Sequence, residues 1–159
     1  MTKFSVSVTE RPLLRLYGLS VRTSMDKAPV DGHHLWEKVF GPRMHEISGK
    51  KSEDYHGLVY GIAVMLDCQN FDYWAAMPAP EGPALPAGMQ AIELPAGLYA
   101  GCHVASMEQL GEVYTYLYET WATEQKEYAV NMQAPCFEYY DKKFYELCTF
   151  EVYIPVLKK

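Results

Sequence analysis

The sequence predicts an α+β fold made of duplicated βαββ repeats with pseudo-two-fold symmetry. The first observation behind this prediction is a proline- and glycine-rich stretch at the midpoint of the 159 residues, Pro78-Ala79-Pro80-Glu81-Gly82-Pro83-Ala84-Leu85-Pro86-Ala87-Gly88. Its four prolines and two glycines exclude a helix or a central strand, so the stretch is a linker or a rim loop. We therefore expect a single domain over residues 1–159, with repeat one at about 4–78, the linker at 79–88 and repeat two at about 89–158.

The second observation is that the two halves match in order. Residues 11–22 overlay residues 94–105 without a gap, and this alignment pairs Pro12 with Pro95. Glycines and valines also coincide, at Gly18 with Gly101 and Val21 with Val104. We predict one long strand for each of these segments.

The third observation is that a helix follows each long strand. In the second half, apolar residues recur with a helical period from Leu110 to Trp121. In the first half, Asp31 is the predicted N-cap of a shorter helix that carries Trp36 and Phe40 and is interrupted at Gly41-Pro42.

Two predicted strands then complete each half. They cover residues 55–66 and 71–78 in the first half, and 135–140 and 147–157 in the second. The expected architecture is a pair of antiparallel sheets that form a cleft, with the helices packed on the opposite side.

The bulk composition narrows the class of function. The net charge of −6 argues against a protein that binds a phosphate backbone, which would need a basic face. The four cysteines form no C-x-x-C pair, and neither a signal peptide nor an apolar run of membrane-spanning length is visible. We expect a cytoplasmic protein with reduced thiols, no membrane contact and no cofactor; the oligomeric state stays open.

A metal site is not expected. His33 and His34 are adjacent, so their side chains point about 100° apart on a helix. Neither histidine has an acidic or cysteine partner at ligand spacing, and a metal site needs three or four converging ligands.

Two predicted strands each hold a glutamate among aromatic and apolar residues, in Cys136-Phe137-Glu138-Tyr139-Tyr140 and Phe150-Glu151-Val152-Tyr153-Ile154-Pro155-Val156. A carboxylate in such surroundings is unfavourable unless it has a partner. A cleft of aromatic rings around a carboxylate suits a cationic or polar aromatic small molecule. The alternative is that both glutamates are solvated edge charges on strands that merely cover a core.

Strand alternation and the repeat together give a candidate site. Aligning Pro78 with Pro155 puts Trp74 opposite Glu151, and aligning the preceding strands puts Tyr60 near Glu138. The predicted ligand-binding residues, all expected on one side of the sheet, are Tyr60, Trp74, Glu138, Tyr140, Glu151 and Tyr153.

On these residues the chain resembles the GyrI-like family, the effector-binding domain that is fused to many AraC- and MerR-type transcription regulators and also occurs alone. The resemblance rests on residues 135–140 and 150–156, on the helix at 113–121 and on the opening Arg11-Pro12-Leu13. It implies a tandem βαββ, SOUL-like fold. It also implies a cleft for amphipathic, often cationic drugs or metabolites around a central glutamate, a role that would fall on Glu138 with Glu151 as second candidate.

The resemblance covers essentially the whole chain, so we expect no helix-turn-helix module and no direct nucleic-acid binding by this chain alone. The expected function is small-molecule binding in sequestration or transcription-linked sensing. Two alternatives stay open. One is hydrolysis of reactive cyclopropane-type toxins with Glu138 as general acid or base, because burial raises the pKa of a glutamate. The other is a protein that inhibits gyrase by contact, like the members that give the family its name.

Overall fold

The computed structural model describes residues 4–49, 57–67, 69–80 and 85–159. Within these residues nine strands form one antiparallel sheet, in the order β1-β6-β9-β8-β3-β4-β2-β5, with β7 paired to β9. The strands are β1 (Val6–Arg11), β2 (Leu14–Ser24), β3 (Val59–Met65), β4 (Asn70–Pro78), β5 (Gln90–Leu94), β6 (Gly97–Val104), β7 (Tyr128–Val130), β8 (Cys136–Tyr140) and β9 (Phe150–Lys158). The predicted α+β fold with antiparallel strands is confirmed.

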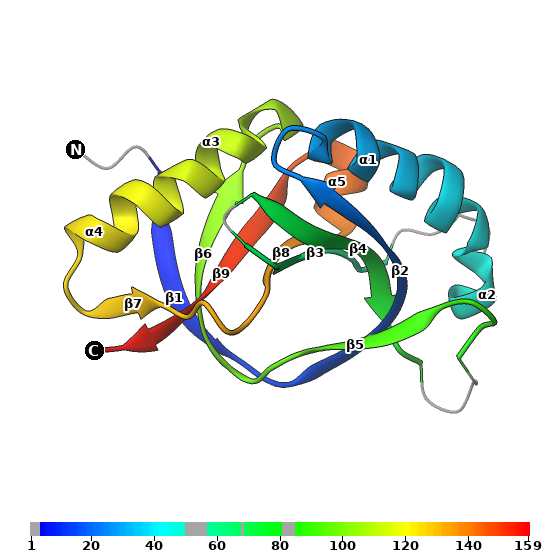
Figure 1. Cartoon of the computed structure of the whole chain (residues 1–159), viewed down its shortest axis with the longest axis horizontal. Coiled ribbons are helices and arrows are strands. Elements are labelled where there is room, and N and C mark those ends of the chain that lie inside the picture. The colour runs from blue at the N-terminus through cyan, green and yellow to red at the C-terminus, as the bar shows by residue number, and fades with distance from the viewer. Residues whose placement is uncertain (1–3, 50–56, 68, 81–84) are drawn as a thin grey trace.

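The helices lie along one side of the sheet in two main groups, one over each half (Figure 1). They are α1 (Ala28–His34), the π-helical η1 (Leu35–Phe40), η2 (Gly41–Arg43), α2 (His45–Ser48), η4 (Met107–Gln109), α3 (Leu110–Thr115), the π-helical η5 (Tyr116–Trp121), α4 (Ala122–Glu124) and α5 (Lys142–Leu147). None of the helices in the described part of the chain has the length and hydrophobicity to cross a membrane.

The first helix begins earlier than predicted. It starts at Ala28, because Pro29 in the first turn has the backbone angle that a helix start requires. Asp31 lies inside the helix and accepts a hydrogen bond from the Thr23 hydroxyl at 2.7 Å.

The strand order has a two-fold axis between β3 and β8. Exchanging β1 with β5, β2 with β6, β3 with β8 and β4 with β9 reverses the order and leaves it unchanged. The residue pairing within the ladders follows the same two-fold symmetry. The pair Tyr60–Ala76 of β3 and β4 corresponds to the pair Phe137–Tyr153 of β8 and β9, each residue 77 positions later. The repeats are therefore equivalent at the level of single residues.

The two predicted long strands, 11–22 and 94–105, correspond to β2 and β6, which begin after Pro12 and Pro95. Each proline separates this strand from an earlier one that was not predicted, β1 or β5, because proline has no N–H for the ladder and a fixed φ. The first arm of each repeat pairs with the other repeat: β1 with β6, and β5 with β2. Each half of the sheet is thus completed by a strand from the other half.

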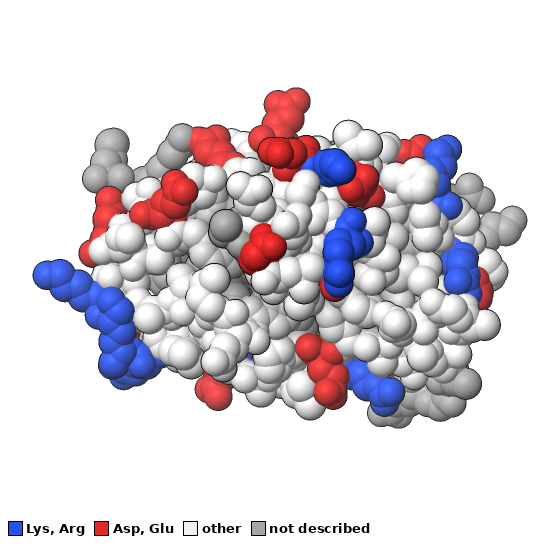
Figure 2. Space-filling model, in the orientation of Figure 1, with Lys and Arg blue, Asp and Glu red and all other residues white. Residues whose placement is uncertain are grey.

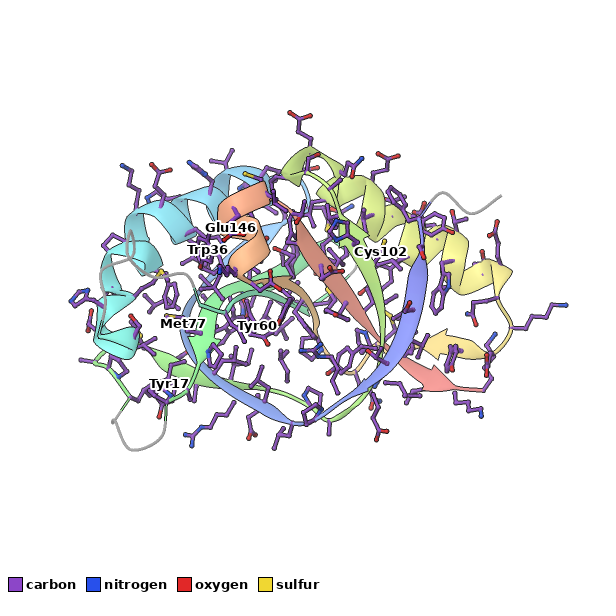
Figure 3. The ribbon with its side chains drawn as sticks, turned by 180° about the vertical axis from the view of Figure 1, so that it is seen from behind. Tyr17, Trp36, Tyr60, Met77, Cys102 and Glu146 are labelled. Atoms are coloured by element: carbon purple, nitrogen blue, oxygen red, sulfur yellow. The ribbon has the colours of Figure 1, made fainter. Side chains whose placement is uncertain are left out.

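Both faces of the sheet are buried. The helix-side cluster contains buried residues such as Leu35, Val113 and Ile154, and it also includes the partly buried Trp36. The opposite face has its own cluster, which includes Tyr60 and Phe137. Figure 3 shows Trp36 close to the helix layer and Tyr60 among the strands.

The connection between the last two strands differs between the repeats. In repeat one the connection is short, and the Leu66 amide donates to the Asn70 carbonyl between the end of β3 and the start of β4. The equivalent residues 143–146 lie in α5, whose Phe144 ring packs 4.8 Å from that of Tyr140. The strand predicted from 147 therefore begins at Phe150. Residues 55 and 56 of another predicted strand and 81–84 of the predicted linker lie outside the described residues.

Candidate functional site

The site is centred on the carboxylate of Glu138, in the middle of β8. The residue is 3% exposed, and its side chain points to the helix side of the sheet. Three phenol groups donate hydrogen bonds to it: Tyr73 and Tyr140 to Oε1 at 3.0 and 2.8 Å, and Tyr114 to Oε2 at 2.8 Å. A buried carboxylate requires partners of this kind, and both oxygens have them.

Three different elements bring these phenols together. Tyr73 comes from β4, Tyr114 from α3, and Tyr140 lies two residues beyond Glu138 on the same face of β8. The indole N–H of Trp36, from η1, donates to the Tyr73 hydroxyl at 2.9 Å and so fixes that phenol from behind. Trp36 also meets the Tyr140 ring edge-on at 6.1 Å. The helix α3 therefore contacts Glu138 directly through Tyr114, and η1 contacts it indirectly, through the bond from Trp36 to Tyr73.

The surroundings of Glu138 favour its protonated, neutral form more than water does. Burial raises the pKa of Glu138, and the three phenol hydrogen bonds lower it by a smaller amount. Burial and the adjacent carboxylate raise the pKa of Tyr73, Tyr114 and Tyr140 well above the ordinary 10.0, so these hydroxyls keep their protons and act as donors.

The two-fold axis explains why there is one acid and not two. The residue equivalent to Glu138 is Gly61, and the two face each other across the β3–β8 ladder. A Cβ at position 61 would lie 2.4 Å from the Tyr73 hydroxyl and 2.6 Å from Glu138 Oε1. The glycine thus leaves the space that the carboxylate and its phenol fill.

The six predicted site residues do not share one face, which corrects the expected arrangement. Glu138 and Tyr140 lie on the helix side. The other four lie on the opposite face, because the ladders place Tyr60 across from Tyr139, and Tyr139 across from Glu151. The residues on that face are Tyr60, Trp74, Glu151 and Tyr153. The central acid therefore lies on the side that the helices cover, and the expected separation of cleft and helices is reversed for Glu138.

Glu151 has a different environment from Glu138. It lies 3.0 Å from the ring nitrogen Nδ1 of His103, and its side chain is 30% exposed. Glu138 has only phenol partners and is almost fully enclosed. Of the two candidate acids, Glu138 is the deeper one.

Sequence reasoning missed three members of the cluster: Trp36, Tyr73 and Tyr114. In the sequence, Tyr114 and Trp36 fall on apolar helix faces, where an aromatic ring needs no further explanation. Tyr73 neighbours Trp74, so a correct face assignment of β4 would have found it. The available signal was the spacing of 77 between Pro78 and Pro155, which also relates Gly61 to Glu138.

The chain is thus a duplicated βαββ protein with a buried acid at its centre, held by phenols beneath the helices. Residues 7–156 match the family of integron-associated effector binding proteins, Cass2, which is GyrI-like. The chain belongs to this family.

Among known proteins, the transcriptional regulator BrlR of Pseudomonas aeruginosa is 33% identical over 140 residues, which are 86% of this chain and 48% of BrlR. The chain therefore spans about half the length of this relative.

Solved structures share the fold at lower identity. An integron cassette protein from the mobile metagenome of Vibrio cholerae has a TM-score of 0.66 and 19% identity, covering 96% of this chain and 95% of that one. The protein SAV2435, solved with bound tetraphenylphosphonium, has a TM-score of 0.68 and 16% identity, covering 96% and 94%.

Proposed function

We propose that the protein binds amphipathic aromatic cations at Glu138, in the cytoplasm, and acts in sequestration or in transcription-linked sensing. The observation that carries this proposal is a buried carboxylate with phenol donors and no cationic partner. Among the described residues, no lysine, arginine or histidine forms an ion pair with Glu138. A ligand that brings a positive charge supplies the missing partner.

The surroundings suit a flat or propeller-shaped aromatic cation. Trp36, Tyr73, Tyr114 and Tyr118 are partly exposed, and their rings provide faces for cation–π and stacking contacts. Glu138 itself is 3% exposed, so binding requires that some of these rings move aside. The ligand then selects an opened conformation, and its measured affinity includes the free energy of opening.

The charge distribution favours the approach of a cation. Figure 2 shows acidic side chains gathered along the edge that carries the helices, with fewer basic ones between them. With a net charge of −6, the field around the chain attracts cations from solution. A protein of the same fold, SAV2435, was solved with tetraphenylphosphonium bound, which makes this cation a suitable probe.

The test compares tetraphenylphosphonium with tetraphenylborate, an anion of nearly the same size and shape. We expect the wild-type protein to bind the cation and to bind the anion at least tenfold more weakly. Glu138→Gln should weaken cation binding by about 2–3 kcal/mol, roughly thirty- to 140-fold in Kd, because the buried charge partner is lost. The affinity should rise with pH as Glu138 loses its proton. Isothermal titration calorimetry measures each of these quantities.

Glu151→Gln is the matched control, because it makes the same chemical change on the same sheet but on the other face. Cation binding should be unchanged in this variant. Equal losses in both variants, or no loss in Glu138→Gln, would remove the carboxylate from the binding site.

A hydrolytic role has one supporting observation, which is the raised pKa of Glu138. The two functions differ in turnover. Consumption of an electrophilic cyclopropane-bearing compound by substoichiometric protein, abolished in Glu138→Gln while binding persists, would replace binding by catalysis as the function.

A further inference from the structure

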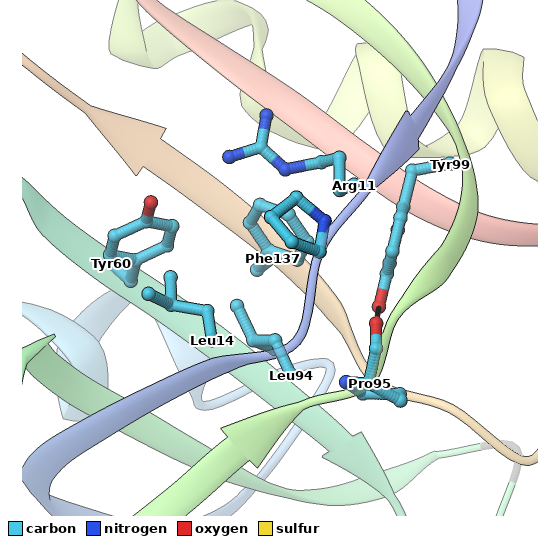
Figure 4. A pocket seen from close by; sticks show the side chains of 8 residues that line it. Arg11, Leu14, Tyr60, Leu94, Pro95, Tyr99 and Phe137 are labelled. Atoms are coloured by element: carbon cyan, nitrogen blue, oxygen red, sulfur yellow. Dashed lines mark hydrogen bonds between the residues drawn. The ribbon is translucent and has the colours of Figure 1, made fainter.

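A pocket lies at the pseudo-two-fold axis, on the face of the sheet opposite to Glu138 (Figure 4). We call it the axial pocket. Its volume is about 100 Å³. Six of its lining residues form three symmetry-equivalent pairs: Arg11 with Leu94, Pro12 with Pro95, and Tyr60 with Phe137. It is a product of the same duplication that created the Glu138 site.

Arg11 is the one charged residue of the lining. Its guanidinium carbon lies 4.7 Å from the ring centroid of Tyr153 and 5.5 Å from those of Phe137 and Tyr139. None of the carboxylates in the described residues forms an ion pair with Arg11. The Arg11 guanidinium also hydrogen-bonds to the hydroxyls of Tyr60 and Tyr153, which leaves the rest of its five N–H groups for a further acceptor, and a carboxylate matches them in geometry.

The remaining polar groups also favour an anion. Tyr60 is 2% exposed, and burial raises its pKa to about 12 against the opposing effect of the Arg11 charge, so its hydroxyl stays protonated. The Tyr99 hydroxyl donates to the Pro95 carbonyl at 2.7 Å and is already engaged. Leu14 and Leu94 supply apolar walls beside Phe137 (Figure 4). The pocket thus combines one cation with an apolar interior.

We propose that the axial pocket binds a small organic carboxylate, with its carboxylate on Arg11 and a single ring or short chain against Phe137, Leu14 and Leu94. An apolar cavity that accommodates benzene has a volume of about 150 Å³, so a pocket of about 100 Å³ limits the ligand to a short chain or to a single ring that remains partly outside it. The charge preference is opposite to that of the Glu138 site on the other face of the sheet. The protein therefore has two sites, which select ligands of opposite charge.

The test uses benzoate, followed by two-dimensional NMR of the full chain. We expect saturable shifts in the signals of Tyr60, Tyr99 and Phe137. Arg11→Leu places at position 11 the residue that stands at the equivalent position 94, and should weaken benzoate binding at least roughly tenfold. Arg15→Leu is the matched control, because it removes the same charge from β2 outside the pocket and should leave binding unchanged.

Further ligands separate charge from shape. Benzamide has the same ring without the charge, and inorganic phosphate has the charge without the ring; both should bind at least tenfold more weakly than benzoate. Equal binding of benzamide, or no loss in Arg11→Leu, would overturn the role of Arg11. Equal binding of phosphate would overturn the preference for an organic acid. If Arg11→Leu does not fold, as judged by thermal melting, Arg11→Gln gives the same comparison.

Each variant should lose binding at one site only. Glu138→Gln should retain benzoate binding, and Arg11→Leu should retain tetraphenylphosphonium binding. Loss of both ligands in either variant would contradict the assignment of two independent sites.

Discussion

The two repeats have the same strand framework, yet they differ at the positions nearest to the axis. Gly61 in repeat one stands where repeat two has Glu138, and Arg11 stands where repeat two has Leu94. The short connection between β3 and β4 corresponds to α5 in repeat two, without any change in the number of residues. The duplication places equivalent strands on both sides of the axis, and the differences between the repeats put an acid on the helix side and an arginine on the opposite face. In each of the two proposed sites, this single charge would give the ligand one orientation.

The strongest test of this comparison adds a side chain to the repeat that lacks one. Gly61→Ala should lower the free energy of unfolding by about 2–3 kcal/mol, because the new Cβ would overlap the Tyr73 hydroxyl and Glu138 Oε1. Urea unfolding measures the change. Gly111→Ala is the control: this helical position has open space, and the variant should be as stable as wild type or up to about 1 kcal/mol more stable. Equal effects at both positions would show that the Glu138 site does not need the space that Gly61 leaves.

A smaller effect is expected when the acid loses one phenol. Tyr114→Phe should destabilise the protein by about 1–2 kcal/mol, because Glu138 Oε2 then lacks its donor. Chemical denaturation gives the difference. Tyr128→Phe removes a hydroxyl from a ring that stacks on Trp121 and should change stability by less than about 0.5 kcal/mol. A loss of similar size in both variants would indicate that phenol hydroxyls matter in general and not at the acid.

The pH dependence of stability tests the acid that only the second repeat has. Because burial raises the pKa of Glu138 above the ordinary 4.5, the folded state binds more protons than the unfolded state in the window between the two values. The contribution of Glu138 to stability therefore decreases as the pH rises above about 4.5, and is constant below. The stability of wild type relative to Glu138→Gln should fall across this window. If the stability difference between wild type and Glu138→Gln increases with pH, the phenol hydrogen bonds lower the pKa of Glu138 by more than burial raises it.

The smallest effect is expected for the other glutamate. Glu151→Gln breaks a contact with His103, whose side chain is 54% exposed, and exposed pairs contribute less than about 1 kcal/mol. The change in stability should be below about 0.5 kcal/mol and should vanish in high salt. A loss comparable to that of Tyr114→Phe would show that both glutamates are structural.

The sequence was sufficient for the fold because proline and glycine mark equivalent positions in both repeats. Pro12 with Pro95 and Pro78 with Pro155 gave the offsets that the ladders follow. The strand with Glu138 has no such marker, and the sequence alignment of Tyr60 with Glu138 is one residue out of register. A one-residue error moves a side chain to the other face, so Tyr60 and Glu138 lie on opposite faces of the sheet.

Alternation could not have revealed this error. Four of the five residues of β8 are buried, and aromatic rings lie on both faces of the strand. Alternation locates a face only where one side of a strand is polar. The phenols of Tyr73 and Tyr114 reach Glu138 from 65 and 24 residues away, and this proximity arises only in the folded chain.

The exchange of β1 and β5 between the halves of the sheet also bears on how the chain folds during synthesis. When the first repeat has left the ribosome, β2 still has an unpaired edge, and β1 has no strand to pair with until β6 is made. Most of the pairing that closes the sheet is distant in sequence, so we expect slow folding in a single late step. Two separately produced halves would each expose the edges that the other half covers, and such edges favour association. The arrangement makes the two repeats depend on each other from the start of folding, well before any ligand arrives.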